Sequence, residues 1–419
     1  MSAAAGTRVR GPVAGAWPLM IAAAAILLVT TGARQSLGLY IAPLHQSTGL
    51  GIADISLALA VGQFVWGASQ PLFGAIADRH GATGVIMAGS LLLAAGFAAT
   101  PYAHTTPGLI WTLGVLSAAG AGAGSFSILI GATAGRLAPE RRGLAAGFIN
   151  AGASFGQFVF APLNQLLIGL VGWVGAIWAM AAMMLSTLPL AWWLHGQPGR
   201  ASASADAAAG PGLRAQLGQA ARNGSYWCLH LGFFTCGFHV AFLVTHLPTE
   251  VSLCGLSGGV AATSLAIIGL ANIAGSLAAG VLGNHYRLKW LLFWMYATRA
   301  VAVAVYMVAP HTALTFYVFA AVLGVTWLST VPPTVGIVGK LFGTRYLATL
   351  FGLTLLTHQI GGFLGAWLGG QAMSRFGNYS WMWYADIVLA LGAALVNLPI
   401  REAPPAPVRL SVATPESPR

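Results

Sequence analysis

Ionisable side chains are scarce within the apolar stretches of this 419-residue chain, and the few that occur there define the chemistry open to it. Two arginines, Arg34 and Arg299, and one carboxylate, Asp386, stand inside long apolar runs, as do His239 and His358. A guanidinium donates two parallel hydrogen bonds to a carboxylate and keeps its charge at every accessible pH. Histidine, in contrast, gains or loses a proton near neutral pH. Together these residue types predict anion binding coupled to proton transfer.

The composition indicates that these residues lie in a membrane. Hydrophobic residues make up 57% of the chain and charged residues only 6%, against about a quarter in a soluble protein. The mean hydropathy of +0.77 and the 55 glycines are typical of many bilayer-spanning helices. The net charge of +11 comes from scattered basic residues that form no long block, so we expect no nucleic-acid partner. The three cysteines lack metal-ligand spacing, so we expect no metal site.

Twelve apolar runs are each long enough to cross a bilayer, which takes about 20 residues. They cover residues 17–44, 53–77, 83–103, 107–137, 143–169, 171–195, 225–250, 257–283, 288–309, 311–341, 345–374 and 379–400. The first run follows basic residues, as the apolar core of a signal peptide does, but its length indicates a retained helix. The sequence therefore predicts an all-α membrane protein with twelve transmembrane helices.

Basic residues predict the orientation of these helices. With both termini in the cytoplasm, the only arginine in an outer loop is Arg375. The cytoplasmic segments then hold sixteen basic residues, namely Arg8, Arg10, Arg79, Arg136, Arg141, Arg142, Arg200, Arg214, Arg222, Arg287, Lys289, Lys340, Arg345, Arg401, Arg409 and Arg419. This asymmetry follows the positive-inside rule and predicts a multi-pass protein of the cell (inner) membrane with cytoplasmic termini.

A Gly-, Ala- and Pro-rich segment divides the runs into six and six. We expect an N-terminal six-helix bundle over 1–195, a flexible cytoplasmic linker over 196–224 and a C-terminal six-helix bundle over 225–402. The Pro-rich residues 403–419 predict a disordered cytoplasmic tail.

The two halves repeat each other at an offset of 205 residues. Gly32 precedes Pro43 by eleven residues in the first run, and Gly237 precedes Pro248 by eleven in the seventh. Glycines nine residues apart recur at the same offset in the fifth and eleventh runs: Gly147 and Gly156, then Gly352 and Gly361. Two related six-helix halves with a site between them near the membrane midplane are a transporter architecture.

The loop after the second run carries the motif GAIADRHG, from Gly74 to Gly81. It resembles the loop 2–3 signature of the major facilitator superfamily, which has glycine, three residues, Asp-Arg, one residue and glycine. The resemblance covers the whole chain and implies two pseudo-symmetric six-helix bundles that give alternating access to a central site. It also implies that Gly74, Asp78, Arg79 and Gly81 stabilise one conformation, with Asp78 at a helix end. A solvated loop aspartate is the alternative interpretation.

Within this superfamily the chain is most similar to the monocarboxylate/oxalate branch. The similarity rests on GARQSLGLYIAPL in the first run, CGFHVAFLVTHLP in the seventh and THQIGGFLGAWLGG in the eleventh. It implies transport of a small organic anion. That branch often has a substrate-binding arginine in its eighth helix, where this chain has Ser276, so another cation must bind the substrate.

Arg34 is the candidate for that cation. Inserting an arginine at membrane depth costs a few kcal/mol, and the side chain cannot lose its proton. We therefore expect the carboxylate of a substrate to pair with the charge of Arg34. The offset of 205 residues aligns Arg34 with His239. A structural arginine, bonded to backbone carbonyls or to Gln and Asn side chains, is the alternative. The predicted substrate-binding residues are Arg34, Tyr40, Gln63, Gln70, Asn150, His239, Asn272, Trp327, His358 and Gln359.

The remaining titratable groups suggest how transport is driven. His239 and His358 are the expected proton-coupling residues, the alternative being neutral histidines that only pack. Arg299 and Asp386 reach similar depths from opposite ends of the ninth and twelfth helices, which predicts a structural ion pair away from the substrate path. A proton-relay role for Asp386 is the alternative.

These observations predict a secondary active transporter that moves a small mono- or dicarboxylate across the inner or plasma membrane by proton-coupled symport. A proton-antiport exporter of a small drug-like or metabolite molecule is the alternative. The expected partners are the anion, protons and the lipid bilayer, with a monomeric protein and the proton gradient in place of a cofactor. We expect no enzyme, because no metal cluster, nucleophile constellation or carboxylate pair is visible in the sequence.

Overall fold

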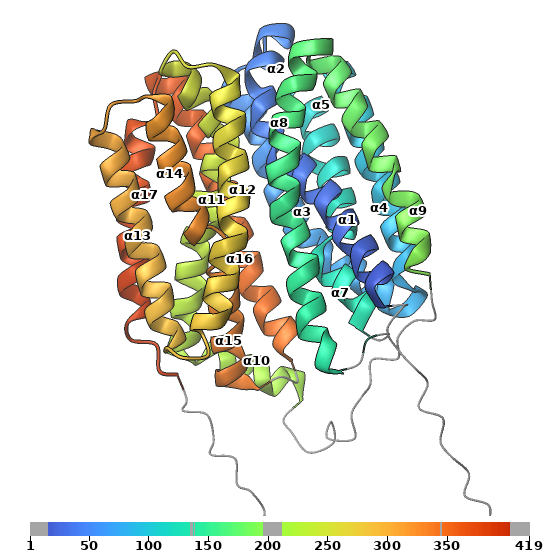
Figure 1. Ribbon diagram of the computed structural model, residues 1–419, viewed down its shortest axis with the longest axis vertical. Helices are drawn as coiled ribbons and strands as arrows, with labels where there is room; N and C mark the ends of the chain where they lie inside the picture. The colour runs from blue at the N-terminus through green and yellow to red at the C-terminus, as the bar shows by residue number, and fades with distance from the viewer. Residues whose placement is uncertain (1–15, 135–136, 138, 196–211, 344–345, 403–419) are drawn as a thin grey trace, which may run out of the picture.

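The structure, a computed structural model, describes residues 16–134, 137, 139–195, 212–343 and 346–402 (Figure 1). Within these residues all regular secondary structure is helical, so the predicted all-α class is confirmed. The first half contains α1 (Ala16–Gln35), η1 (Leu37–Tyr40), α2 (Ile41–Thr48), α3 (Ile52–His80), α4 (Ala82–Ala99), η2 (Thr100–Tyr102), α5 (Thr106–Leu109), η3 (Ile110–Ser117), α6 (Ala118–Ala123), α7 (Phe126–Ala134), α8 (Pro139–Leu185) and α9 (Thr187–Trp193). The second half contains α10 (Leu213–Ala221), α11 (Gly224–Leu253), α12 (Gly258–Leu282), α13 (Leu288–Val308), α14 (Ala313–Thr326), α15 (Val331–Phe342), α16 (Leu347–Phe376) and α17 (Ser380–Asn397).

Ten stretches of the described residues are long and apolar enough to cross a membrane. One of them, Ala145–Trp193, has 49 residues, about twice the length that a crossing needs. The chain turns inside it at Gly172, whose φ of 71° lies in the left-handed region that glycine adopts freely. Counting this stretch as two helices and adding the 30-residue α16 gives the twelve predicted crossings.

Three crossings are interrupted helices. The first bends after α1, where Ser36 Oγ donates to the carbonyls of Gly32 and Ala33 at 3.1 and 2.9 Å, and continues through the 3₁₀ turn η1 into α2. The fourth contains the π-helical segment η3. The tenth breaks between α14 and α15, because Pro332 and Pro333 have no N–H with which to continue the helical ladder. Such irregular backbone at membrane depth is tolerated where it is buried in protein or lines a cavity.

The helices form two halves that lie side by side, drawn in blue to green and in yellow to red in Figure 1. In the first half α1 meets α8 at glycines: a Cβ on Gly32 would lie 2.7 Å from the carbonyl carbon of Gly156. The corresponding pair in the second half is α11 and α16, where a Cβ on Gly237 would lie 1.8 Å from the carbonyl oxygen of His358. Because Gly32 and Gly237 stand 205 residues apart, the sequence repeat corresponds to equivalent helix contacts.

Contacts between the two bundles run along α3 with α16 and α8 with α12. A Cβ on Gly67 would lie 2.3 Å from Cγ of Gln359, and one on Gly269 would lie 2.7 Å from the carbonyl oxygen of Ser154. We call the side where α1 begins and α17 ends, at the bottom of Figure 1, the near side. The opposite side, at the top of the picture, is the far side. At the far side a Cβ on Gly370 of α16 would lie 2.4 Å from Cβ of a serine on α3. The bundles are therefore in tight contact from the middle to the far side.

Towards the near side the same helix faces lose these contacts. Glycines two or three turns along from a contact residue lie on the same face of each helix. None of the described atoms would lie within 4 Å of a Cβ on any of these glycines: Gly74 of α3, Gly147 of α8, Gly280 of α12 and Gly352 of α16. The two bundles are thus closed together on the far side and separated on the near side.

Part of the predicted linker lies within the described residues and includes a helix. Of residues 196–224, the structure describes 212–224, which include α10. Gln216 of α10 donates from Nε2 to the carbonyl oxygen of Phe342 at 2.8 Å, which holds this helix against the near-side end of α15. The predicted tail, 403–419, lies outside the described residues.

Candidate functional site

A small cavity lies beside Arg34, at the point where α1 ends and the chain bends into η1. It is open to one side and lined by both polar and apolar side chains. Its polar lining consists of Arg34, Gln63, Ser117 and Thr245. The rest of the lining is apolar: Leu37, Gly38, Leu59, Gly62, Leu113, Ala118 and Val244. Since Val244 and Thr245 belong to α11, both bundles form this cavity.

The guanidinium of Arg34 is held by two residues of α3. Nη2 donates to Oε1 of Gln63 at 2.8 Å, and the guanidinium carbon lies 4.3 Å from the ring centroid of Trp66. Gln63 and Trp66 stand three residues apart, so they lie on one face of α3. Both contacts orient the guanidinium but neither carries a negative charge. Neither ion pair found in the described part of the chain includes Arg34.

Tyr40 lies close to Arg34 in the fold but outside the cavity lining. Its hydroxyl donates to Oδ1 of Asn164 on α8, and Nδ2 of Asn164 donates to Oγ of Ser36 at 2.6 Å. All three side chains are buried. This network ties the bend after α1 to α8 and thereby positions Arg34. Asn164 was not predicted, because the bend that creates its partner is not visible as a sequence pattern.

Two further predicted residues of the first bundle also lie outside the cavity lining. Gln70 is buried on α3 and accepts a hydrogen bond from Oγ of Ser127 at 3.4 Å. Asn150 is half-buried on α8. Neither is brought together with Arg34 in this structure.

Asn272 and Gln359 lie at the contact between the bundles. Nδ2 of Asn272 donates to Oγ of Ser154 on α8 at 2.8 Å, and its Oδ1 accepts from the backbone N–H of Leu328 at 2.9 Å. Gln359 packs against Gly67. These two side chains join the bundles near their middle and are not cavity residues in this conformation.

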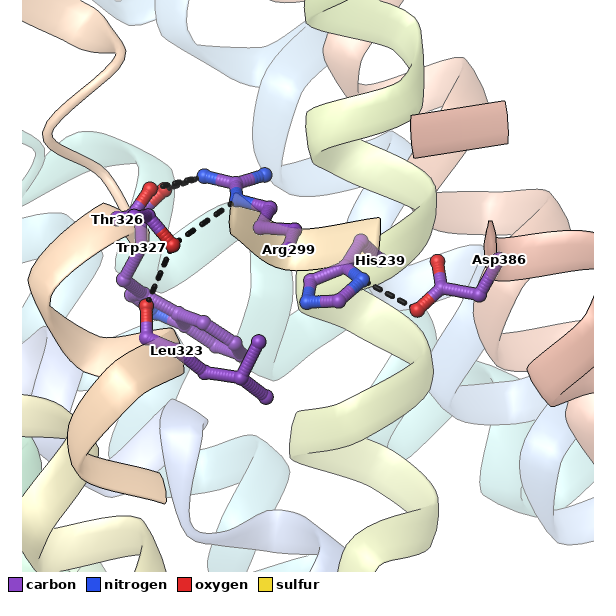
Figure 2. Close-up of polar contacts among 6 residues, drawn as sticks. All are labelled: His239, Arg299, Leu323, Thr326, Trp327 and Asp386. Atoms are coloured by element: carbon purple, nitrogen blue, oxygen red, sulfur yellow. Dashed lines mark hydrogen bonds and ion pairs between the residues drawn. The ribbon is translucent and has the colours of Figure 1, made fainter. Parts of the chain in front are cut away.

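The predicted ion pair between Arg299 and Asp386 is wrong. Figure 2 shows that Asp386 instead accepts a hydrogen bond from Nδ1 of His239, and that the guanidinium of Arg299 points away from it. Arg299 donates from Nη2 to the carbonyl oxygens of Thr326 and Trp327. These carbonyls are available because α14 ends there, whereas Nη1 of Arg299 is buried and has no hydrogen-bond partner among the described residues.

The other two predicted residues of the second bundle are Trp327 and His358. The buried ring of Trp327 has its centroid 6.1 Å from that of His239. His358 is buried on α16, with its ring centroid 4.8 Å from that of Phe233 and its Nδ1 3.3 Å from Nε2 of Gln359. None of these side chains lines the Arg34 cavity. The predicted site therefore divides into an arginine cluster in the first bundle and a histidine cluster in the second.

The loop motif lies at the near-side end of α3. Gly81 has a φ of 92°, a value that favours glycine, and it both ends α3 and precedes α4. Arg79 is exposed in the last turn of α3. The side chain of Asp78 lies outside the described part of the structure, so its predicted role stays a prediction.

A buried carboxylate was missed by the sequence analysis. Oε1 of Glu250, near the far-side end of α11, accepts from the hydroxyl of Tyr306 at 2.7 Å and from Nε1 of Trp383 at 3.2 Å. Its position three residues from the end of a long helix is typical of a solvated residue. Only the aromatic side chains of α13 and α17 around it show that it is buried.

Twelve helical crossings in two similar bundles, with a polar cavity between them at an interrupted helix, define a membrane transport protein. Residues 23–366 and 255–418 match the profile of the Major Facilitator Superfamily, and the chain belongs to this family. The protein is therefore a transporter and not an enzyme, as predicted.

Curated relatives cover nearly the whole chain. It is 26% identical over 397 residues to monocarboxylate transporter 13 of Rattus norvegicus, which covers 93% of this chain and 90% of that protein. It is 25% identical over 365 residues to the oxalate:formate antiporter of Oxalobacter formigenes, which covers 86% of each. The predicted similarity to the monocarboxylate/oxalate branch is confirmed.

Solved structures show the same fold at low identity. A bacterial homolog to the human lysosomal transporter Spinster, crystallised in an inward-facing and occupied conformation, superposes with a TM-score of 0.76 at 15% identity. A D-xylose-proton symporter superposes with a TM-score of 0.74 at 14% identity. Each match covers 92% of this chain and 97% of the other chain. At these identities the likeness concerns the fold alone.

Proposed function

We propose that this transporter moves a small organic anion, whose carboxylate binds Arg34, across the membrane by alternating access. The observation that carries the proposal is the guanidinium of Arg34, which faces a cavity and is held by the neutral groups of Gln63 and Trp66. An arginine offers five N–H donors, and a carboxylate accepts two of them in parallel. The cavity therefore contains a positive charge that the carboxylate of a substrate would neutralise.

The lining of the cavity supports a small polar substrate. The hydroxyls of Ser117 and Thr245 offer further hydrogen bonds beside the guanidinium of Arg34. The names of the relatives agree with this class, since they are a monocarboxylate transporter and an oxalate:formate antiporter. The guanidinium of Arg34 can bind the carboxylate of a monocarboxylate or one of the two carboxylates of a dicarboxylate.

The arrangement of the bundles supports alternating access with the near side in the cytoplasm. The bundles are closed on the far side and separated on the near side. Most described basic residues outside the helix interiors lie on the near side, whereas Arg375 lies on the far side. By the positive-inside rule the near side of the protein in the cell membrane faces the cytoplasm. The conformation described is therefore open to the cytoplasm.

The energy for transport would come from a proton gradient, with no cofactor. The N-terminal bundle carries Arg34, and His239 and His358 of the C-terminal bundle are buried side chains that can gain and lose a proton. Cotransport of one anion with one proton moves no net charge. Symport is therefore the mode that this set of residues favours.

Counterflow in proteoliposomes tests this function. Purified protein is reconstituted with unlabelled L-lactate or oxalate inside, and entry of the same ¹⁴C-labelled anion is followed. Arg34→Ala should lose about 2–5 kcal/mol of binding free energy, or roughly 30- to several-thousand-fold in affinity. Arg34→Lys should lose most of the same binding free energy, because an ammonium lacks the two parallel N–H donors of a guanidinium. Arg375→Ala, which removes an exposed arginine on the far side, is the matched control. Wild-type affinity in folded Arg34→Ala would refute the proposal.

A further inference from the structure

His239 of α11 and Asp386 of α17 form a hydrogen-bonded pair in the interior of the second bundle (Figure 2). Their exposed fractions are 1% and 0%, so neither group reaches solvent. Neither lines the Arg34 cavity. The second atom of each group, Nε2 of His239 and Oδ1 of Asp386, has no hydrogen-bond partner among the described residues. The pair is therefore half-satisfied, which is costly at such depth.

The hydrogen bond determines which atom of the pair takes up a proton. A carboxylate oxygen accepts from Nδ1–H, so Asp386 selects the tautomer in which Nε2 carries a free lone pair. Figure 2 shows this second nitrogen on the side of the ring away from Asp386. Proton uptake at Nε2 gives an imidazolium that keeps its hydrogen bond to the carboxylate, and proton release restores the neutral ring.

Other charged and titratable groups lie on helices of the same bundle. Arg299 of α13 keeps a fixed positive charge at the break between α14 and α15, where its partners are backbone carbonyls. The other such groups are Cys236 and His246 on α11, Tyr296 on α13, His358 on α16 and Tyr379, the residue before α17. Arg299 and Asp386 balance each other in charge although they do not touch. The protonation state of His239 then determines whether Arg299, Asp386 and His239 together are neutral or carry one positive charge.

Helix α11 connects the pair with the Arg34 cavity. Val244 and Thr245, which line the cavity, follow His239 by five and six residues on the same helix. Anion binding adds one negative charge at Arg34, and proton binding at His239 adds one positive charge. The empty and the doubly loaded proteins therefore carry the same net buried charge, whereas single loading changes it. At low dielectric this difference favours binding both or neither.

We propose that the His239–Asp386 pair is the proton-binding site of the transporter, separate from the anion site and located in the other bundle. This inference rests on the proposed function. It gives Asp386 a direct role, since the carboxylate fixes the tautomer and stabilises the imidazolium. It leaves His358 outside the proton site.

Proteoliposomes with an imposed pH gradient test the coupling. In the wild type, accumulation of ¹⁴C-labelled L-lactate or oxalate should rise about tenfold for each pH unit of inward gradient. His239→Gln and Asp386→Asn should lose this accumulation. Both should keep counterflow at saturating anion, although His239→Gln should bind the anion more weakly because it cannot supply the compensating charge. His246→Gln is the matched control, because it removes a buried histidine of the same helix that is bonded to Ala366 and Tyr379. Gradient-driven accumulation retained in His239→Gln would overturn the inference.

A second measurement needs no substrate. Infrared difference spectra of the purified wild type between about pH 5 and about pH 8 should contain a histidine protonation band. Because the chain has ten histidines, this band should be reduced in His239→Gln, and the component that His239 contributes should shift in Asp386→Asn and persist in His246→Gln. An identical band in all four proteins would overturn the inference. The proposed function fails separately, if counterflow is absent in the wild type or survives in Arg34→Ala.

Discussion

Gln63→Glu is a nearly isosteric change that tests whether the charge of Arg34 is reserved for a substrate. It replaces the amide by a carboxylate whose oxygen stays 2.8 Å from Nη2 of Arg34. Two charges about 4 Å apart attract by about 4 kcal/mol at the effective dielectric constant of a protein near its surface. Part of this gain is offset by desolvation of the new carboxylate. We expect the substrate to lose about 2–4 kcal/mol, or roughly 30- to 1,000-fold in affinity.

The assay is equilibrium binding of the labelled anion that counterflow identifies, measured with the thermal stability of each purified variant. Gln63→Glu should unfold at the wild-type temperature or above it, because the buried cation gains a partner. Gln63→Leu removes the acceptor without adding charge, and it should cost only about 1 kcal/mol of binding. Wild-type affinity in a folded Gln63→Glu protein would refute the reasoning, because a neutralised Arg34 would then still bind the anion.

Two other predictions concern stability and conformation. Burial alone would raise the pKa of Glu402, but hydrogen bonds from Nζ of Lys340 and the backbone N–H of Lys289, with the charge of Lys340, lower it overall. This stabilisation is present above the unfolded pKa of about 4.3 and is lost as the pH falls through the lower folded value, so Tm should drop there, and less so in Glu402→Gln. Gly38→Ala should abolish counterflow, because its Cβ would lie 2.2 Å from the carbonyl oxygen of Val244, whereas Gly392→Ala, which meets open space, should not. Full counterflow in Gly38→Ala would contradict the far-side closure described above.

The sequence predicts that Arg34 lacks a carboxylate partner, because this prediction needs only a count of acidic residues. Asp386 is the only acidic residue deep within an apolar run, so an arginine far from it has no internal carboxylate partner. The repeat was equally accessible, because the close approach of α1 to α8 and of α11 to α16 requires glycine at fixed positions. Residue identity and spacing carry both kinds of information.

The partner of Asp386 was not accessible in the same way. Depth along a helix follows from residue number, but the direction of a side chain around the bundle depends on how the helices pack. Arg299 and His239 both lie deep within apolar helices, and only packing brings His239 to Asp386.

The helix break at Trp327 determines whether Asp386 pairs with Arg299 or with His239. The sequence WLSTVPPT indicates an interruption, but it does not show that the freed carbonyls of Thr326 and Trp327 face Arg299. Because two backbone oxygens accept from Arg299, Asp386 pairs with His239 instead. In our proposal this pair binds the proton, and Arg34, which has no carboxylate partner among the described residues, binds the anion.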